Sequence, residues 1–495
     1  MAFRATYLAV LAVTLVGQLA ALGFEMAVAA RFGTGAAADT LAFALVLVLS
    51  LTTEVSGWVS TLVVPLYVEA RATSAAAAAA FLRRMLLALM MLVVLGAMAF
   101  GAAAPAIASL LAPTLGAAGT AMLRAFAPLI VLAPLATLFS AALQANDRFV
   151  GAAARQIAWY GGGLAAIVLV APTLGPLAAP LGMLAGMALF TVLLAGGALR
   201  LTAGGDAGGP ALRRAAALLA PLVVLSACSA RHVAVERALA ARLPEGSLAA
   251  LTYAYRLLHF PLALFVVNAG AMLLPALSAH AASGRDEAAG ALMGRAIRVA
   301  LVFAVPLAAL TMALAQPLTT VVLERGAFTT SSTALTATAI AWYAPAAIAL
   351  AIMQLLYRVY QARQALWSLA WRAGTATAMS IVLMTVCSAG LGLRGLPLGI
   401  SLATFAGAAL MLRGLPGLAL LPGARALAGL GLAGVAAFAA AWFARSAFVD
   451  GAALALVGGG AAGLAAYAGV LFAVAPSEAR TVLAVLAPAV SGRPA

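Results

Sequence analysis

The sequence predicts an all-α polytopic membrane protein built from two similar halves. Of its 495 residues, 66% are hydrophobic and 8% are charged, and the mean hydropathy is +1.13, a balance typical of chains that lie mostly in lipid. Apolar stretches of roughly 20 to 30 residues separate the charged clusters, which is long enough for helices to cross about 30 Å of hydrocarbon. The chain also repeats itself at an offset of about 211 residues, so the two halves are expected to share one architecture.

We predict fourteen transmembrane helices, each an apolar stretch bounded by charged or loop-forming residues. In chain order they cover residues 6–30, 37–66, 80–110, 120–145, 150–173, 178–200, 212–242, 247–280, 290–321, 332–362, 368–392, 395–413, 425–446 and 452–474. The first stretch is interpreted as a helix and not as a signal peptide, because its apolar pattern continues through Arg31.

The internal repeat is carried by charged, glycine, proline and glutamine residues. Glu25, Arg31, Gly35, Pro128, Gln144 and Arg155 recur in the same order as Glu236, Arg242, Gly246, Pro345, Gln361 and Arg372. Such halves enclose a central substrate site in many transporters. We therefore expect an N-terminal lobe over residues 1–203, a cytoplasmic linker over 204–210, a C-terminal lobe over 211–415, two further helices within 416–475 and a cytoplasmic tail over 476–495.

The basic charge is distributed as membrane topology requires. The net charge is +15 and all basic residues apart from the histidines are arginines. If the N-terminus lies in the cytoplasm, nineteen of the 28 arginines fall on the cytoplasmic side, as the positive-inside rule predicts. Both termini are then cytoplasmic, and the charge gives no reason to expect nucleic acid as a partner.

Charged residues inside or near the predicted helices are the main candidates for function, because an unpaired charge in hydrocarbon is costly. They are Arg124, Arg231, Arg237 and Arg256, together with Glu25, Asp39, Glu54 and Glu236. His232 shares a helix face with Glu236 by its four-residue spacing, and His259 shares one with Arg256 by its three-residue spacing. These groups are expected to line a cavity, although ion pairs between helices, packed histidines and arginines reaching the headgroups are the simpler alternatives.

The sequence contains no pattern that indicates catalysis. We find no nucleophile or metal-ligand spacing and no GK[ST] phosphate-binding loop. Cys228 and Cys387 lie in predicted helices and form neither a disulfide framework nor a metal site. We expect a transporter and not an enzyme, with no cofactor and no metal.

Four motifs resemble the MurJ/MviN lipid II flippases of the MOP exporter superfamily. Leu22–Asp39 (LGFEMAVAARFGTGAAAD) is similar to the first helix and loop of that family. Tyr253–Pro261 (YAYRLLHFP), continued by Leu273–Ser278 (LLPALS), is similar to its eighth helix with a central arginine. Leu323–Thr329 (LERGAFT) and Tyr360–Gln364 (YQARQ) complete the pattern.

The resemblance implies two six-helix lobes that rock, with helices 13 and 14 forming a groove for a lipid tail. The expected substrate is lipid II, an undecaprenyl-pyrophosphate-linked precursor of peptidoglycan, moved across the bacterial cytoplasmic (inner) membrane by a monomer in contact with membrane lipids. Arg256 matches the cavity arginine of the family and Asp39 its loop aspartate. We add as substrate-binding candidates Arg237, Arg231, Glu25 and Glu54, and as coupling or gating candidates Glu236, His232 and His259.

The chain departs from the family pattern at two basic positions. The family has an arginine and an aspartate after LGF, where this chain has Phe24 and Glu25, and a second family arginine is missing near Leu51. The expected cavity is therefore less basic than that of a lipid II flippase. Two other functions stay open: a flippase for another polyprenyl-linked unit, such as O-antigen or exopolysaccharide, and a cation-coupled antiporter using Glu25, Glu54 and Glu236. A scaffold that transports nothing is the remaining alternative.

Overall fold

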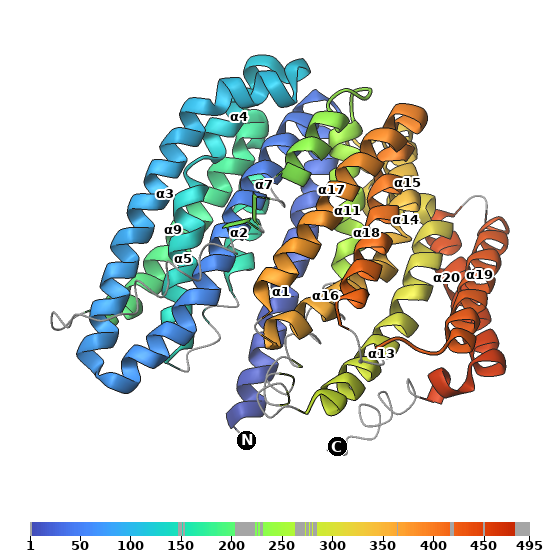
Figure 1. The fold of residues 1–495 in the computed structure, drawn as a ribbon. Coiled ribbons are helices and arrows are strands. Elements are labelled where there is room, and N and C mark those ends of the chain that lie inside the picture. The colour runs from blue at the N-terminus through green and yellow to red at the C-terminus, as the bar shows by residue number, and fades with distance from the viewer. Residues whose placement is uncertain are drawn as a thin grey trace. The chain divides into compact units, whose positions relative to one another are not determined.

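A computed structural model describes residues 2–146, 151, 154–202, 223–224, 226–227, 231–262, 273, 277, 280, 285–363, 365–415, 420–448 and 451–480. Over this part of the chain the regular structure is entirely helical (Figure 1). The helices form two compact units, one of Met1–Thr252 with Arg325–Phe328 and the other of Tyr253–Glu324 with Thr329–Ala495. The predicted linker at 204–210 lies outside the described residues.

The first unit contains the helices of the N-terminal half. They are α1 (Ala2–Phe32), α2 (Ala36–Thr73), α3 (Ala75–Leu111), η1 (Pro113–Leu115), α4 (Gly116–Phe126), α5 (Leu129–Gln144), η2 (Ile157–Gly161), α7 (Gly162–Leu169), α8 (Ala171–Leu174), η3 (Gly175–Leu177), α9 (Ala178–Ala198) and η4 (Leu199–Thr202). Helix α11 (Ser247–Leu262) starts in this unit and ends in the other.

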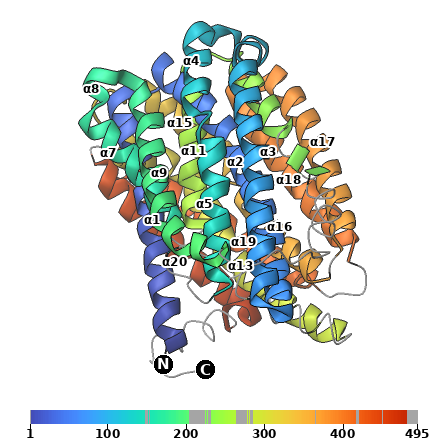
Figure 2. The ribbon, with the colours of Figure 1, turned by 90° about the vertical axis from the view of Figure 1, so that its left-hand side faces the viewer.

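Apolar side chains hold α2, α3 and α5 together. Val63, Leu82, Leu138 and Ala142 belong to one buried cluster contributed by these three helices. Helix α9 packs on the other side of α5 and also on α7, so that α9, α5, α2 and α3 lie beside one another (Figure 2). This arrangement leaves the helices long enough to cross a membrane while their polar side chains gather inside the unit.

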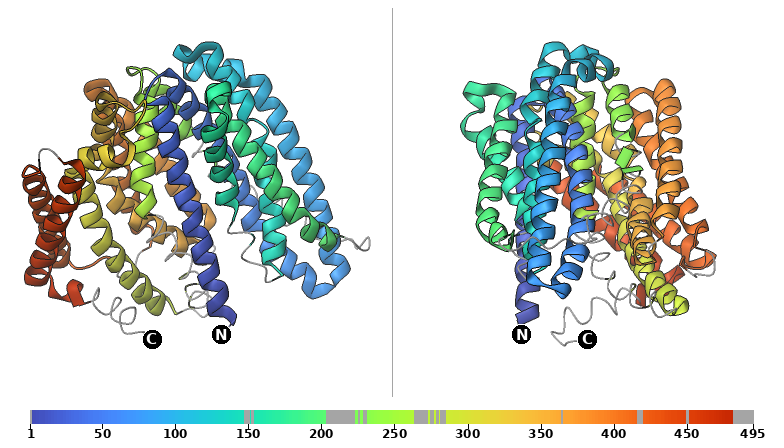
Figure 3. Two further views of the ribbon diagram at one scale, coloured as in Figure 1. Left: turned by 180° about the vertical axis from the view of Figure 1, so that it is seen from behind. Right: turned by 60° about the vertical axis from the view of Figure 1, so that its left-hand side comes forward.

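The second unit contains the remaining helices. They are α13 (Asp286–Ala313), α14 (Ala315–Leu323), α15 (Thr330–Tyr343), α16 (Ala346–Ala362), α17 (Leu366–Leu391), η6 (Gly392–Arg394), α18 (Gly395–Arg413), α19 (Ala424–Arg445) and α20 (Ala452–Val474). The pair α19 and α20, red in Figure 3, is packed through glycine: a Cβ on Gly463 would lie 2.9 Å from the Ala437 carbonyl oxygen. Small residues allow this close approach between helices in lipid.

The repeated prolines mark equivalent breaks in the two halves. Pro128 precedes α5 directly after α4, and Pro345 precedes α16 directly after α15. A proline at the start of a helix has no N–H to leave unpaired. Helices α15 and α16 are bent by 51° at their break. The repeat seen in the sequence therefore corresponds to a repeated helix interruption.

Nine described helical stretches are long and apolar enough to cross a membrane, or ten if the bent pair α15–α16 is one span. The chain is thus a multi-pass membrane protein, as predicted. The structure shows fewer spans than the fourteen predicted, for three reasons. Residues 367–413 count as one stretch although they hold both α17 and α18, the helix at Ile157–Leu169 is shorter than a full span, and the predicted helices at 212–242 and 247–280 lie partly outside the described residues.

Candidate functional site

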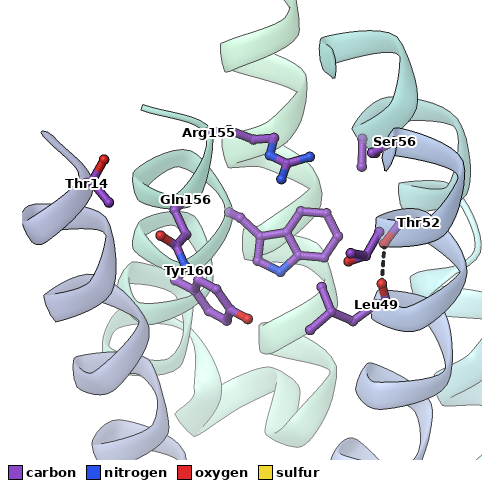
Figure 4. Close-up of a pocket in the computed structure, with 10 residues that line it drawn as sticks. Thr14, Leu49, Thr52, Ser56, Arg155, Gln156 and Tyr160 are labelled. Carbon is purple, nitrogen blue, oxygen red and sulfur yellow. Dashed lines mark hydrogen bonds between the residues drawn. The ribbon is translucent and has the colours of Figure 1, made fainter. Parts of the chain in front are cut away.

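A polar cavity of about 400 Å³ lies within the first unit. It is lined by Thr14 of α1, by Leu49, Thr52, Thr53 and Ser56 of α2, by Ala133 of α5, and by Arg155, Gln156, Trp159 and Tyr160. Figure 4 shows Arg155, Gln156 and Tyr160 on one side of this space and Leu49, Thr52 and Ser56 on the other. A second cavity of about 280 Å³ shares Thr53, Ser56 and Arg155 with the first. Arg155 therefore faces both spaces.

The guanidinium of Arg155 is the charged group of this site. Its Nη1 donates to Thr137 Oγ1 at 3.1 Å, and Thr137 in turn donates to the Ala133 carbonyl oxygen at 2.8 Å. Arginine has five N–H donors and no acceptor, so one bond to a neutral hydroxyl uses little of its capacity. Among the described residues that line the two cavities there is no carboxylate. The site is consequently cationic.

Three buried polar atoms along these cavities have no hydrogen-bond partner among the described residues. They are Ser56 Oγ, Trp159 Nε1 and Ser140 Oγ, on side chains 3%, 5% and 6% exposed. Leaving a buried donor unpaired costs about 1–3 kcal/mol, so each such atom requires an explanation. A site built to receive a polar ligand provides one.

The cavity side chains after α5 are carried by a π-helical turn. Residues Ile157–Gly161 form this turn, immediately after Arg155 and Gln156. Its wider winding brings residues four and five positions apart onto similar sides, so Arg155, Gln156, Trp159 and Tyr160 all reach the cavity. Such turns are rare and occur frequently at functional sites.

Glycines clamp this turn against α9. A Cβ added to Gly186 would collide with the carbonyl oxygen of Ala158 in the π-turn, and one added to Gly162 would collide with the carbonyl oxygen of Gly182. Only glycine permits backbones to approach this closely. The contact with α9 therefore fixes the positions of Trp159 and Tyr160 in the π-turn.

The repeat equivalent of Arg155 has a different environment. Arg372 of α17 donates from Nη1 to the Ser368 carbonyl oxygen at 3.2 Å and also to the Ser368 hydroxyl. Its guanidinium lies 5.8 Å from the ring centre of Tyr360, whose hydroxyl donates to the Met411 carbonyl oxygen at 2.8 Å. In the second half this arginine joins neighbouring helices.

Asp39 lies in the first turn of α2 and is buried. Its two carboxylate oxygens accept the backbone N–H groups of Gly246 at 2.7 Å and Ala249 at 2.8 Å, at the start of α11. Glu245 in turn accepts the N–H of Ala36 at 2.8 Å. Each of the two helices is capped by an acid from the other half of the repeat. The structure gives Asp39 this role, and its contact with substrate stays a prediction.

Three further candidates of the first unit, Arg237, Glu236 and Glu54, have side-chain partners. Arg237 is buried, pairs with Glu236 at 2.6 Å and donates to Thr252 at 3.0 Å. Glu54 accepts the Ser226 hydroxyl at 2.5 Å. The same hydroxyl accepts the indole N–H of Trp58 at 2.8 Å.

Glu25, His232 and Arg231 lie at different depths. Glu25 is 3% exposed, whereas Arg231 is exposed to the surroundings of the protein. His232 is half-buried, and its Nδ1 has no hydrogen-bond partner among the described residues. None of the nine predicted residues lines the two cavities.

Arg256 and His259 lie on α11 within the second unit. Arg256 is half-buried. The ring of His259 stacks on Tyr255 with ring centres 3.9 Å apart, and Tyr255 meets Tyr343 edge-on at 6.5 Å. His259 is thus part of an aromatic stack, and its predicted part in gating stays a prediction.

Arg155 is not among the site residues predicted from the sequence, where it counts only as a member of the internal repeat and as one of the cytoplasmic arginines. The signal that could have found it was the repeat, in which Arg155 and Gln144 recur as Arg372 and Gln361. An arginine that recurs at the same place in both halves, together with a glutamine that also recurs, is as strong a candidate for the functional site as the residues predicted above.

Three comparisons place the chain among known proteins. A family model described as lipid II flippase MurJ matches residues 28–456. Lipid II flippase MurJ of Burkholderia cenocepacia is 28% identical over 155 residues, which are 31% of this chain and 30% of that protein. A probable lipid II flippase MurJ of Bdellovibrio bacteriovorus is 35% identical over 121 residues, 24% of this chain and 23% of that protein. The matched part is less than a third of either relative.

Solved structures extend the likeness over nearly the whole fold. A lipid II flippase MurJ in an inward closed conformation has a TM-score of 0.80 at 18% identity and covers 93% of this chain and 97% of its own. An inward-facing multidrug resistance MATE transporter of the MOP superfamily has a TM-score of 0.68 at 15% identity, covering 82% of this chain and 97% of its own. At these identities the likeness establishes the fold.

Proposed function

We propose that this chain, which belongs to the lipid II flippase MurJ family, moves lipid II from the inner to the outer leaflet of the bacterial cytoplasmic membrane. The family recognised from the LGF, YAYRLLHFP and LERGAFT motifs is thereby confirmed. Members of this family are transporters and not enzymes. The observation that carries the proposal is the family match over residues 28–456.

The chemistry of the cavity in the first unit supports an anionic substrate. Arg155 and the unpaired donors around it line a cavity whose described residues include no carboxylate. A pyrophosphate has strong acceptor oxygens, and arginine forms charge-assisted hydrogen bonds with such groups. A lipid-linked pyrophosphate fits this donor set.

We infer a rocking mechanism from the duplicated architecture. The proposed moving parts are the lobes 1–203 and 211–415, with helices 13 and 14 within 416–475 as a groove for the lipid tail. The equivalent breaks at Pro128 and Pro345 supply candidate bending points. Both termini would lie in the cytoplasm and the protein would act as a monomer.

Among the residues predicted from sequence, Arg256 is the proposed contact for the pyrophosphate in the second unit, where it is half-buried on α11. Arg237 is a weaker candidate, since its charge is balanced by Glu236. Asp39 would act on transport through the helix start that it caps. Glu54 is already engaged with Ser226.

A flippase for a different polyprenyl-linked saccharide is the second candidate function. It is favoured by Phe24, which replaces a family arginine and is fully buried. Its ring lies 5.9 Å from that of Tyr160 and against Gly163 behind the π-turn, so no basic side chain can take its place there without changing the site. A cation antiporter would need carboxylates in the cavity, and the described lining has none.

Complementation tests the proposed function. Wild type is expected to restore growth to a strain depleted of its lipid II flippase, and Arg256→Ala to do so poorly at equal membrane abundance. Equal rescue by both would remove Arg256 from the mechanism. No rescue by wild type, together with rescue of a strain lacking an O-antigen or exopolysaccharide flippase, would establish the second candidate instead.

A further inference from the structure

We propose that the paired cavities around Arg155 are an oxyanion-binding subsite, which holds one phosphoryl or carboxylate group of the transported molecule within the first unit. The identity of that molecule rests on the proposed function, whereas the oxyanion chemistry rests on the site alone. None of the residues predicted from sequence belongs to this site.

The unpaired donors specify what the ligand must offer. An indole N–H can only donate, so Trp159 Nε1, 5% exposed and without a partner among the described residues, needs an acceptor. Ser56 Oγ is equally buried and unpaired, and lines both cavities. Together with the guanidinium of Arg155, these unpaired groups match a ligand rich in acceptor oxygens.

The charge of the site excludes a cationic ligand. Arg155 lines both cavities, and the lining residues that the structure describes include no Asp or Glu. A cation would meet the guanidinium without a compensating carboxylate, whereas an oxyanion would neutralise it and accept its remaining N–H groups. Burial strengthens this preference, because the interaction is little screened by water.

The size and lining of the cavities accommodate more than the anion. The larger cavity lies within the roughly 300–1,000 Å³ typical of small-ligand sites. The smaller one, about 280 Å³, is lined by Ser60, Thr137, Ser140 and Gln144 in addition to the shared residues. These hydroxyl and amide groups suit the hydroxyls of a sugar attached to the anion.

The two halves of the chain provide a matched control. Arg372 occupies the repeat position of Arg155 but is held by Ser368 and packed over Tyr360. Trp58, in the same half as Trp159, provides a second control. Its indole N–H is bonded to Ser226, whereas the indole N–H of Trp159 has no partner among the described residues. Removing Arg372 or the Trp58 nitrogen should therefore disturb packing without removing an open ligand donor.

Direct binding to the purified full-length protein tests the subsite. Wild type, Arg155→Ala, Arg155→Lys, Trp159→Phe, Arg372→Ala and Trp58→Phe would be titrated with undecaprenyl pyrophosphate, inorganic pyrophosphate and a water-soluble muropeptide, after thermal unfolding has shown each variant to be folded. Arg155→Ala should weaken binding about 10- to 100-fold, Trp159→Phe about 3- to 10-fold, and both controls less than about twofold. Arg155→Lys should recover part of the affinity, because charge is kept but the planar fork is lost.

The three ligands separate the sources of the oxyanion. Weakening confined to the two pyrophosphate ligands assigns the subsite to the phosphoryl groups, and weakening confined to the muropeptide assigns it to a carboxylate of the head group. Equal affinities of wild type and Arg155→Ala for all three ligands, or no binding to wild type, would overturn the subsite. Arg155-dependent binding in a protein that fails the complementation test would uphold the subsite and reject lipid II transport.

Discussion

Asp39 and Glu245 cap each other's helices. Asp39 accepts two N–H groups at the start of α11, and Glu245 accepts the N–H of Ala36 at the start of α2. The first N–H groups of a helix have no partner within it, and a carboxylate there also interacts favourably with the helix dipole. The start of each helix is thus fastened to an acidic residue of the other half.

We expect Asp39→Ala to lower the free energy of unfolding by about 1–2 kcal/mol, because both capped N–H groups lose their acceptor. Thermal unfolding of the purified protein in detergent measures the loss. Asp286→Ala is the control, since Asp286 also lies in the first turn of a helix but forms an exposed ion pair with Arg363 at 2.7 Å, worth at most about 1 kcal/mol. Equal stability of wild type and Asp39→Ala would show that the cap contributes nothing.

Gly326 is expected to tolerate no side chain. Its φ is +60°, and an added Cβ would collide with the Ala30 carbonyl oxygen, which also accepts the N–H of Ala327 at 2.8 Å. Gly326→Ala should destabilise by more than the roughly 1–2 kcal/mol that the left-handed backbone costs alone. Gly175→Ala isolates that backbone cost, since Gly175 has φ +57° and no atom within 4 Å of an added Cβ. Similar losses in both variants would show that the contact with Ala30 is unimportant.

Glu324 should give the protein a stability that depends on acid. It accepts the hydroxyls of Thr333 at 2.6 Å, Thr320 at 2.9 Å and Thr330 at 3.1 Å, and the hydrogen bond from Thr333 is the main cause of a lowered pKa. A carboxylate with a lowered folded-state pKa stabilises above its unfolded pKa, and that contribution is lost as the pH falls through the folded value. Wild type should therefore unfold at a higher temperature than Glu324→Gln at pH 7, and the difference should shrink below about pH 4. A difference that stays constant over this range would contradict the assignment.

Gly186→Ala is expected to disturb the cavity from the side of α9. The new methyl group would push Ala158 and the π-turn away from α9, costing about 1–3 kcal/mol of stability and weakening pyrophosphate binding without touching the ligand. Gly96→Ala, where nothing lies within 4 Å of an added Cβ, should leave both properties unchanged. Full binding by a folded Gly186→Ala protein would show that the clamp does not position the site.

The fold was accessible from the sequence because lipid imposes simple rules on it. Long apolar stretches separated by arginine-rich loops indicate transmembrane helices. The recurrence of Pro128 as Pro345 indicated an equivalent helix break in each half. The division between the predicted helices at 368–392 and 395–413 was also accessible, and the structure places the short helix Gly392–Arg394 between α17 and α18.

The site was less accessible, since charge alone does not distinguish a partnered group from an open one. The sequence places Arg237 inside a predicted helix and Arg155 among the cytoplasmic arginines. The structure pairs Arg237 with an adjacent glutamate and leaves Arg155 with one hydroxyl bond among the described residues. The cavity around Arg155 also depends on the π-turn that follows it, and no periodic pattern in the sequence predicts such a turn.

The π-turn at Ile157–Gly161 also bears on how specificity can evolve in this fold. A turn of this kind holds one residue more than a regular helix would need. Deleting a single residue there would return the helix to its ordinary pitch and change which side chains of the turn face the cavity with Arg155. The membrane-spanning architecture would survive such a deletion, while the convergence of donors would be lost. A single in-frame codon deletion or insertion is thus enough to separate relatives that share a scaffold but not a cargo.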